Sequence, residues 1–212
     1  MSPRSQGPKS AWNLLQASRR CYSLGGVSAP SSRNLWDIVK RAEFENHDAK
    51  HVHDIWMEFH ADPLKHRVAD VMTAAQYAVF SENAARSPMF VLPIFKGPNA
   101  FETIMVQCQL PCVLLTSLEE YKRQGPVAVP FMTMTHYTEL QSTKSVVLVR
   151  GDIVDPNALT RFEATSLMRM VHEFYTERAK HVFVHAFNHN PPSFDFKRML
   201  DSMGHDTSNL PR

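Results

Sequence analysis

The chain has 212 residues, 23 of them Lys or Arg and 21 Asp or Glu, which gives a formal net charge of +2. Four of the basic residues precede residue 23, so the remainder has 19 basic against 21 acidic residues, a charge of −2 that argues against nucleic-acid binding by phosphate neutralisation. The length suits one domain with its own core, and no apolar run approaches the roughly 20 residues that cross a bilayer.

The N-terminal segment is basic, rich in Ser and free of Asp and Glu up to Asp37. This composition is typical of a mitochondrial transit peptide, because import draws a cationic amphipathic helix toward a negative potential. Arg20 lies three residues before a peptide bond that resembles a matrix-peptidase site, which predicts cleavage between Tyr22 and Ser23. We expect a transit peptide over residues 1–22, with a boundary as late as about 33, and a location in the mitochondrial matrix. The alternative is a disordered basic arm.

The segment from residue 34 to about 80 has apolar residues at helical spacing. A Ser and Asn start signal at Ser32 to Asn34 precedes the first stripe, and Asp62-Pro63 ends the second. We expect three amphipathic helices packed on a shared core, since a lone exposed helix would not bury its stripe. The stripes are Leu35, Ile38, Val39 and Ala42; Val52, Ile55, Trp56 and Phe59; and Val68, Val71, Met72 and Ala75, continuing to Val79.

Between Ser87 and Gly151 the pattern changes to short β-prone runs separated by Pro, Gly or polar breaks. Leu110-Pro111 lies between two runs and predicts a tight hairpin. Leu118 to Gln124 predicts a short helix before Gly125-Pro126. The expected strands are Phe90 to Phe95, Phe101 to Gln109, Cys112 to Thr116, Val129 to Tyr137 and Ser145 to Arg150.

The C-terminal part is expected to add a long helix, a strand and a short helix. The long helix should begin near Asp155 to Asn157, and His181 to Asn188 predicts a sixth strand. These elements together predict a single α+β domain over residues 34–204, with a mainly antiparallel sheet of about six strands, and a disordered tail over 205–212. The helical stripes are Leu167, Met170, Val171 and Phe174, and then Phe196, Met199, Leu200 and Met203 after Pro191-Pro192.

The motifs of common catalytic chemistries are missing from the sequence. Only four glycines follow residue 36, and neither phosphate-binding glycine motif nor a G-x-S-x-G nucleophile elbow occurs. His172-Glu173 begins like the zinc-protease motif H-E-x-x-H, but Thr176 occupies the position of the second His. We therefore expect no catalytic, cofactor-binding or metal-binding residues. A group of histidines near the second helix is interpreted as solvated surface: His47, His51, His53, His60 and His66.

Two cysteines, Cys108 and Cys112, remain after the presumed transit peptide. Their spacing does not match a zinc knuckle, and thiols in a reducing compartment are most often ordinary thiols. A redox role, or a nucleophilic pair with a distant histidine such as His136 or His185, stays open at this point.

Six segments in order resemble one family, the mitochondrial ATP synthase F(1) complex assembly factor 1 family. Asp54 to His60 is similar to its I-W-x-x-[YF]-H helix, and Phe90 to Phe95 is similar to its F-[VI]-L-P core strand. The resemblance covers roughly residues 50 to 203, within the predicted 34–204 domain. The other matching segments are Leu115 to Lys122, His136 to Leu140, Val146 to Asp152, and Phe187 to Phe196.

The resemblance implies a non-catalytic chaperone of the β subunit of ATP synthase. Such a protein would bind free β subunit, prevent its aggregation and hand it to the α subunit during hexamer assembly. The physical need is clear, because an unpartnered subunit of an obligate ring exposes a large apolar interface. It further implies no cofactor, no nucleic acid, no stable membrane association and a monomeric free state. The alternatives are an accessory subunit retained in a mitochondrial complex and, less favoured, a small matrix enzyme with a His or Cys site.

Two segments of the resemblance are candidates for partner contact, the end of the strand before residue 140 and the Pro-rich exit from the last predicted strand. Polar residues there could rim an apolar patch. The alternative is that the aromatic residues are hinge and core elements, because aromatics at strand ends usually pack. The candidates are His136, Tyr137, Glu139, Leu140, Phe187, Asn188 and Phe194.

Overall fold

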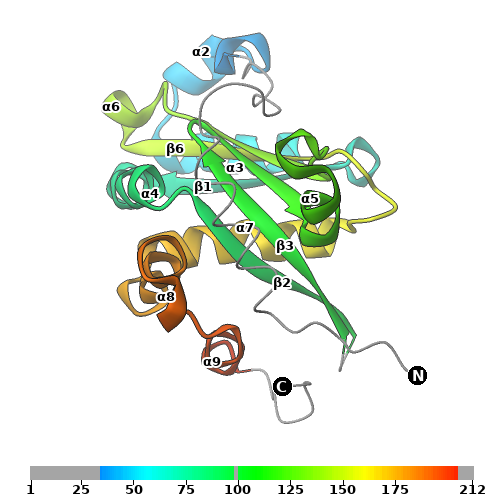
Figure 1. Ribbon diagram of the computed structural model, residues 1–212. Coiled ribbons are helices and arrows are strands. Elements are labelled where there is room, and N and C mark those ends of the chain that lie inside the picture. Colours follow the sequence, from blue (N-terminus) through cyan, green and yellow to red (C-terminus); the bar gives the residue numbers. More distant parts are fainter. Residues whose placement is uncertain (1–33, 98–99, 205–212) are drawn as a thin grey trace, which may run out of the picture.

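Six strands form one antiparallel sheet within residues 34–97 and 100–204, the part of the chain that this computed structural model describes (Figure 1). The predicted transit peptide with its cleavage site at Tyr22 and Ser23, and the predicted tail over 205–212, lie outside those residues. The spatial order is β1-β6-β5-β4-β3-β2, with every neighbouring pair antiparallel, which confirms the α+β prediction. The strands are β1 (Arg67–Thr73), β2 (Met89–Gly97), β3 (Ala100–Gln109), β4 (Cys112–Ser117), β5 (Met132–Tyr137) and β6 (Val146–Ile153).

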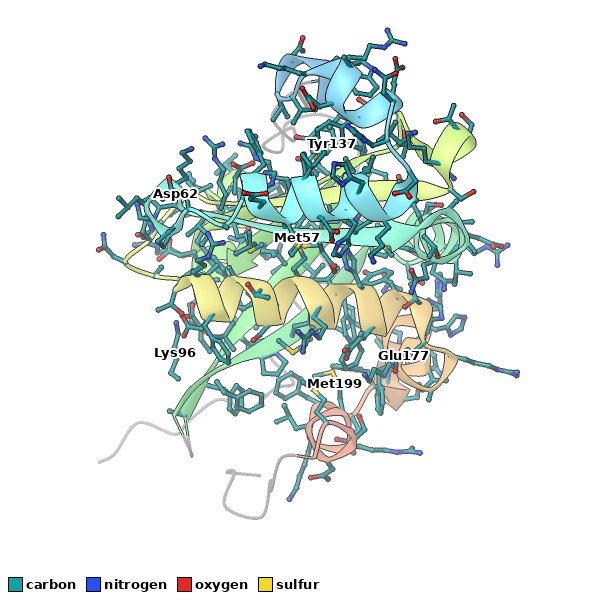
Figure 2. The ribbon with its side chains drawn as sticks, turned by 180° about the vertical axis from the view of Figure 1, so that it is seen from behind. Met57, Asp62, Lys96, Tyr137, Glu177 and Met199 are labelled. Carbon is teal, nitrogen blue, oxygen red and sulfur yellow. The ribbon has the colours of Figure 1, made fainter. Side chains whose placement is uncertain are left out.

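Helices cover both faces of the sheet. On one face, buried residues of α4, α7, α8 and α9 join the larger hydrophobic cluster with Met134 and Val149 of the central strands. Figure 2 views the sheet from its β1 side and shows the long helix α7 on one side of it and the helix α3, which carries Met57, on the other. The helices are α2 (Arg41–Glu45), α3 (Ala49–Phe59), α4 (Ala74–Arg86), α5 (Leu118–Gln124), α6 (Gln141–Lys144), α7 (Arg161–Thr176), α8 (Arg178–His189) and α9 (Phe196–Ser202), with short 3-10 turns η1 (Leu35–Asp37), η2 (Pro63–Lys65), η3 (Gly125–Val127) and η4 (Pro191–Ser193).

The segment from η1 to α3 forms a second, smaller cluster on the opposite face. Trp56 is fully buried there, and its Nε1 donates to the Val149 carbonyl oxygen at 3.1 Å. Its ring lies edge-on to Tyr137 at 5.8 Å. Side chains alternate between the faces along a strand, so Leu148 and Val149 of β6 reach different clusters. The first predicted helix is divided here into η1 and α2.

The third predicted helix is wrong in its first half, because Arg67–Thr73 is strand β1 and the helix α4 begins only at Ala74. Val68 contributes to the larger cluster, whereas Val71 packs against the smaller one. A strand that carries apolar residues on both faces no longer alternates between apolar and polar residues. The spacing of its apolar residues can then match that of a helix. Thr73 then starts α4 through a capping box with Gln76.

The predicted strand His181 to Asn188 is also wrong, since Arg178–His189 is the helix α8. Its β-prone residues favour a strand locally, but Val184 and Phe187 are three positions apart and both are buried on one helical side. The sixth strand of the sheet is β1 instead. The long helix α7 begins at Arg161, after a capping box between Thr160 and Glu163, rather than near Asp155.

Side chains bond main-chain groups at both edges of the sheet. At β2, the Asn188 amide accepts from the Met89 N–H at 3.2 Å and donates to the Met89 carbonyl oxygen at 2.6 Å, as a neighbouring strand would. At β1, the Arg161 guanidinium donates to the Arg67 carbonyl oxygen. In the same strand, two main-chain N–H groups donate to side chains. The Val71 N–H donates to Asp70 Oδ1, and the Thr73 N–H donates to Gln76 Oε1.

The predicted hairpin at Leu110-Pro111 is confirmed, and this peptide bond is cis. The strands predicted between Ser87 and Gly151 and the helix over Leu118–Gln124 are confirmed as well. Within the described residues, none of the helices has the length and apolar character needed to span a membrane.

Candidate functional site

The strand-end candidates lie mostly in the core. Tyr137 and Leu140 are 5% and 1% exposed and belong to the smaller cluster. Glu139 is half-buried, and its Oε1 accepts from the Leu35 N–H at 2.8 Å. These residues therefore hold the segment from η1 to α3 against the sheet. His136 follows the strand alternation to the opposite face, where its ring stacks on Phe80 at 4.8 Å.

The C-terminal candidates belong to the larger cluster. Phe187 is 6% exposed, and its ring meets Phe194 at 5.1 Å and Phe90 at 5.8 Å. Asn188 bonds both main-chain groups of Met89 and also donates to the Val184 carbonyl oxygen. The structure thus places the two candidate sets in different clusters, and the burial supports the core interpretation for Tyr137, Leu140 and Phe187. A contact of these residues with a partner stays a prediction.

A hydrogen-bonded chain of side chains crosses the larger cluster and was not predicted. Asp70 Oδ2 of β1 lies 3.2 Å from His172 Nδ1 of α7, and His172 Nε2 lies 3.3 Å from His136 Nε2 of β5. His136 Nδ1 completes the chain at the Pro111 carbonyl oxygen, 3.1 Å away. The Asp70 end is at the surface, whereas His136 is 2% exposed.

This chain needs one proton more than two neutral imidazole rings carry. The Asp70 carboxylate and the Pro111 carbonyl oxygen only accept, so three bonds require three N–H groups on the two rings. Burial raises the pKa of the Asp70 carboxyl, but the hydrogen bond and charge of His172 outweigh it, and the net effect is a lowered pKa. The three bonds therefore cannot all form while both rings are neutral, because two neutral rings supply only two N–H groups. The chain ends on a main-chain carbonyl and joins β1, α7, β5 and the β3–β4 turn.

Burial, and after it the charge of His172, lowers the pKa of His136 to about 3, so this ring is neutral at ordinary pH. His172 could have been noticed in the sequence, because it follows Met168 by four residues on the buried side of α7. Asp70 carried no such signal, since its neighbours in β1 were assigned to a helix.

One of the histidines interpreted as solvated is not at the surface. His60 is 3% exposed at the end of α3, where its ring lies 4.2 Å from Trp56 and its Nδ1 hydrogen-bonds the Trp56 carbonyl oxygen at 2.9 Å. Burial lowers the pKa of His60 to about 4. His60 follows Trp56 by four residues, so it continues the buried side of α3, a signal that the sequence contained. The other four are exposed, as predicted: His47, His51, His53 and His66.

The two thiols lie on opposite faces of the sheet and are poorly suited to nucleophilic chemistry. Burial raises the pKa of the Cys108 thiol to about 12 despite its hydrogen bond with Tyr175. Burial also raises the pKa of Cys112, whose Sγ lies 3.8 Å from Thr135 Oγ1. Cys112 pairs with Thr135 in the sheet, so His136 points to the other face and forms no pair with it. Among the described residues, no group of three or more His, Cys, Asp or Glu side chains is arranged to hold a metal ion.

The fold and these contacts define an α+β protein in which buried polar side chains connect strands and helices. The segment before β1 covers one face of its sheet. A family model described as ATP11 protein matches residues 8–200. The chain belongs to this family, which confirms the resemblance found in its sequence motifs.

Several curated relatives share this similarity. The protein named "Protein atp11, mitochondrial" of Schizosaccharomyces pombe is 31% identical over 104 residues, 47% of this chain and 36% of that protein. "ATP synthase mitochondrial F1 complex assembly factor 1" of Danio rerio is 25% identical over 164 residues, 76% of this chain and 53% of the relative. The Homo sapiens protein of the same name is 26% identical over 156 residues, 72% and 46% of the two chains. The chain therefore spans about half the length, or less, of the curated relatives it matches.

Proposed function

We propose that this protein is a mitochondrial assembly factor for the F1 sector of ATP synthase. The observation that carries the proposal is the family match over residues 8–200, together with relatives that are named as F1 complex assembly factors. In the finer form of the proposal, the chain binds the unassembled β subunit in the matrix, prevents its aggregation and releases it to the α subunit. It acts as a monomer without catalysis, and no cofactor takes part.

Physical features of the described residues support this role. Several large apolar side chains are exposed, with Leu64 at 83% and Phe162 at 81%, and such side chains can cover an apolar surface of another protein. The raised thiol pKa values of Cys108 and Cys112 speak against a cysteine nucleophile, which is the rival enzyme hypothesis.

The test is binding of the 212-residue chain to separately produced β and α subunits, with β aggregation followed by light scattering. We expect selective binding to β, suppressed scattering, and dissociation of the complex when α is added. Absence of binding to either subunit, with unchanged scattering, would remove the role. Comigration with the finished ATP synthase at fixed stoichiometry would instead support a retained accessory subunit.

A further inference from the structure

Exposed apolar side chains gather at one end of the sheet. Leu64 of η2, Val129 before β5, Val154 after β6 and Phe162 of α7 are 83%, 68%, 52% and 81% exposed. We call these four residues the apolar end. They come from three connections and one helix start, which lie together at the edge of Figure 1 where the chain passes from β6 into α7.

Main-chain hydrogen bonds show that the three connections meet. The Ile153 N–H donates to the His66 carbonyl oxygen at 2.9 Å, which joins the β6 end to the η2 loop. The Val154 N–H donates to the Phe131 carbonyl oxygen at 2.8 Å, which joins it to the segment before β5. Leu64, Val129 and Val154 are therefore each within two residues of a bonded junction.

Arg161 fixes the fourth residue beside them. Its guanidinium donates to the carbonyl oxygens of His60, at 2.6 Å, and Asp62, at 3.3 Å, and also to that of Arg67. The start of α7, and with it Phe162, is thereby bonded to both sides of the η2 loop. Figure 2 shows Asp62 at the same end of the molecule as Lys96.

A second set of bonds holds the connection between β6 and α7. Lys96 Nζ donates to the Ala158 carbonyl oxygen at 2.9 Å and to Glu163 Oε1 at 2.7 Å. Glu163 also closes the capping box with Thr160. Exposed apolar residues that are scattered singly are ordinary, but a group whose backbone is held by such bonds loses little backbone entropy on binding.

Several charged groups around the apolar end are paired with one another. Lys96 pairs with Glu163 at 2.7 Å, and Arg150 pairs with Asp152. The weaker pairs Asp62–Lys65 and Arg67–Asp152 lie at 3.6 and 3.9 Å. Such pairing lowers the net charge beside the patch, which favours an apolar complementary surface over a nucleic acid or an anionic membrane.

We propose that the apolar end is the surface that contacts the unassembled β subunit, through the apolar interface that this subunit exposes before assembly. This inference rests on the function proposed above. It assigns the contact to Leu64, Val129, Val154 and Phe162, and it leaves Tyr137 and Phe187 to the core.

The test uses Leu64→Asp, Phe162→Asp and the double variant in the 212-residue chain. Phe162 is the second residue of α7, where a carboxylate near the helix N-terminus is tolerated. Matched controls are Val79→Asp on α4 and Val182→Asp on α8, which are 44% and 57% exposed and lie on other parts of the surface. Binding to purified β subunit is measured for variants whose melting temperature stays near that of the original chain.

We expect the double variant to bind β roughly tenfold or more weakly, since central apolar contacts dominate such interfaces, while both controls bind as the original chain does. If the original chain binds β and the Leu64 and Phe162 variants bind it equally well, the assignment is overturned and the proposed function stands. Equal losses in the controls would overturn it too. If the original chain does not bind β, both proposals fail. Concentration-dependent dimers that the double variant abolishes would make a second copy the occupant and overturn the assignment to β.

Discussion

Gly151 of β6 is a residue at which one methyl group should matter. A Cβ there would lie 2.4 Å from Met132 Cε and 2.7 Å from Val68 Cγ2, and the branched Val68 cannot turn away freely. We expect Gly151→Ala to lower the free energy of unfolding by about 1–3 kcal/mol, as overpacking does. Urea unfolding measures this.

Gly97→Ala is the matched control for that change. A Cβ at Gly97 of β2 meets nothing within 4 Å, so we expect a neutral or slightly stabilising effect. Equal stability of Gly151→Ala and the original chain would contradict this prediction. It would show that Val68 of β1 and Met132 of β5 can shift to accommodate the methyl group without loss of stability.

At the scale of single residues, the sequence left open whether the candidate aromatic residues pack in the core, for a physical reason. Tyr137 and Phe187 belong to recognisable motifs, yet burial depends on the distant residues that cover them, Trp56 and Phe90. The bond between His172 and Asp70 spans 102 positions, and local spacing contains no information about such a pair. The four surface histidines, by contrast, could be assigned from their polar neighbours alone.

Asn188 of α8 is expected to stabilise the β2 edge of the sheet. Asn188→Ala removes the bonds to both main-chain groups of Met89, which are partly shielded from water. We expect a loss of about 1–3 kcal/mol in the free energy of unfolding and faster hydrogen exchange of the Met89 N–H.

Asn188→Asp refines this experiment. The carboxylate can still accept from the Met89 N–H, but it can no longer donate to the carbonyl oxygens of Met89 and Val184. We expect protection of the Met89 N–H to persist while stability falls at least as far as in Asn188→Ala. Unchanged stability in both variants would mean that the amide bonds contribute nothing net at this edge.

At the scale of elements, the sequence predicted the strands β2 to β6, the Leu110-Pro111 hairpin and the helix α5. Each of these is delimited by Pro, Gly or polar residues within a few positions. The errors at Val68 to Thr73 and at His181 to Asn188 share one cause. Both segments are short and apolar, and the helix or strand form of such a segment is decided by the layer on which it packs.

The whole molecule should lose stability in mild acid. His60, beside Trp56, and His136, in the larger cluster, have pKa values of about 4 and about 3, lowered chiefly by burial. Both are neutral in the fold and bind protons in the unfolded chain below its pKa of about 6.5, so the unfolded state gains protons as the pH falls. Their stabilising effect is complete above about pH 6.5. It declines below that value by at most about 1.4 kcal/mol per pH unit for each group.

Urea unfolding at pH 7.5, 6.0 and 5.0 measures this decline. His60→Asn retains a donor for the Trp56 carbonyl oxygen but has no titrating ring, so we expect its stability to fall about half as steeply. His53→Asn, at an exposed position, serves as the control and should follow the original chain. The hypothesis is wrong if His60→Asn and His53→Asn give the same slope.

The side chains bonded to the outer strands β1 and β2 also limit how another chain can pair with this sheet. Bonds from Asn188 and Arg161 occupy main-chain groups that an incoming extended segment would need. A misfolded chain offering such a segment therefore finds those positions taken, and strand exchange would require these bonds to break first. Under the function proposed above, these bonds would hinder pairing of β1 and β2 with strands of an aggregating subunit. A partner bound only through side chains could then dissociate without breaking any strand pairing of this protein.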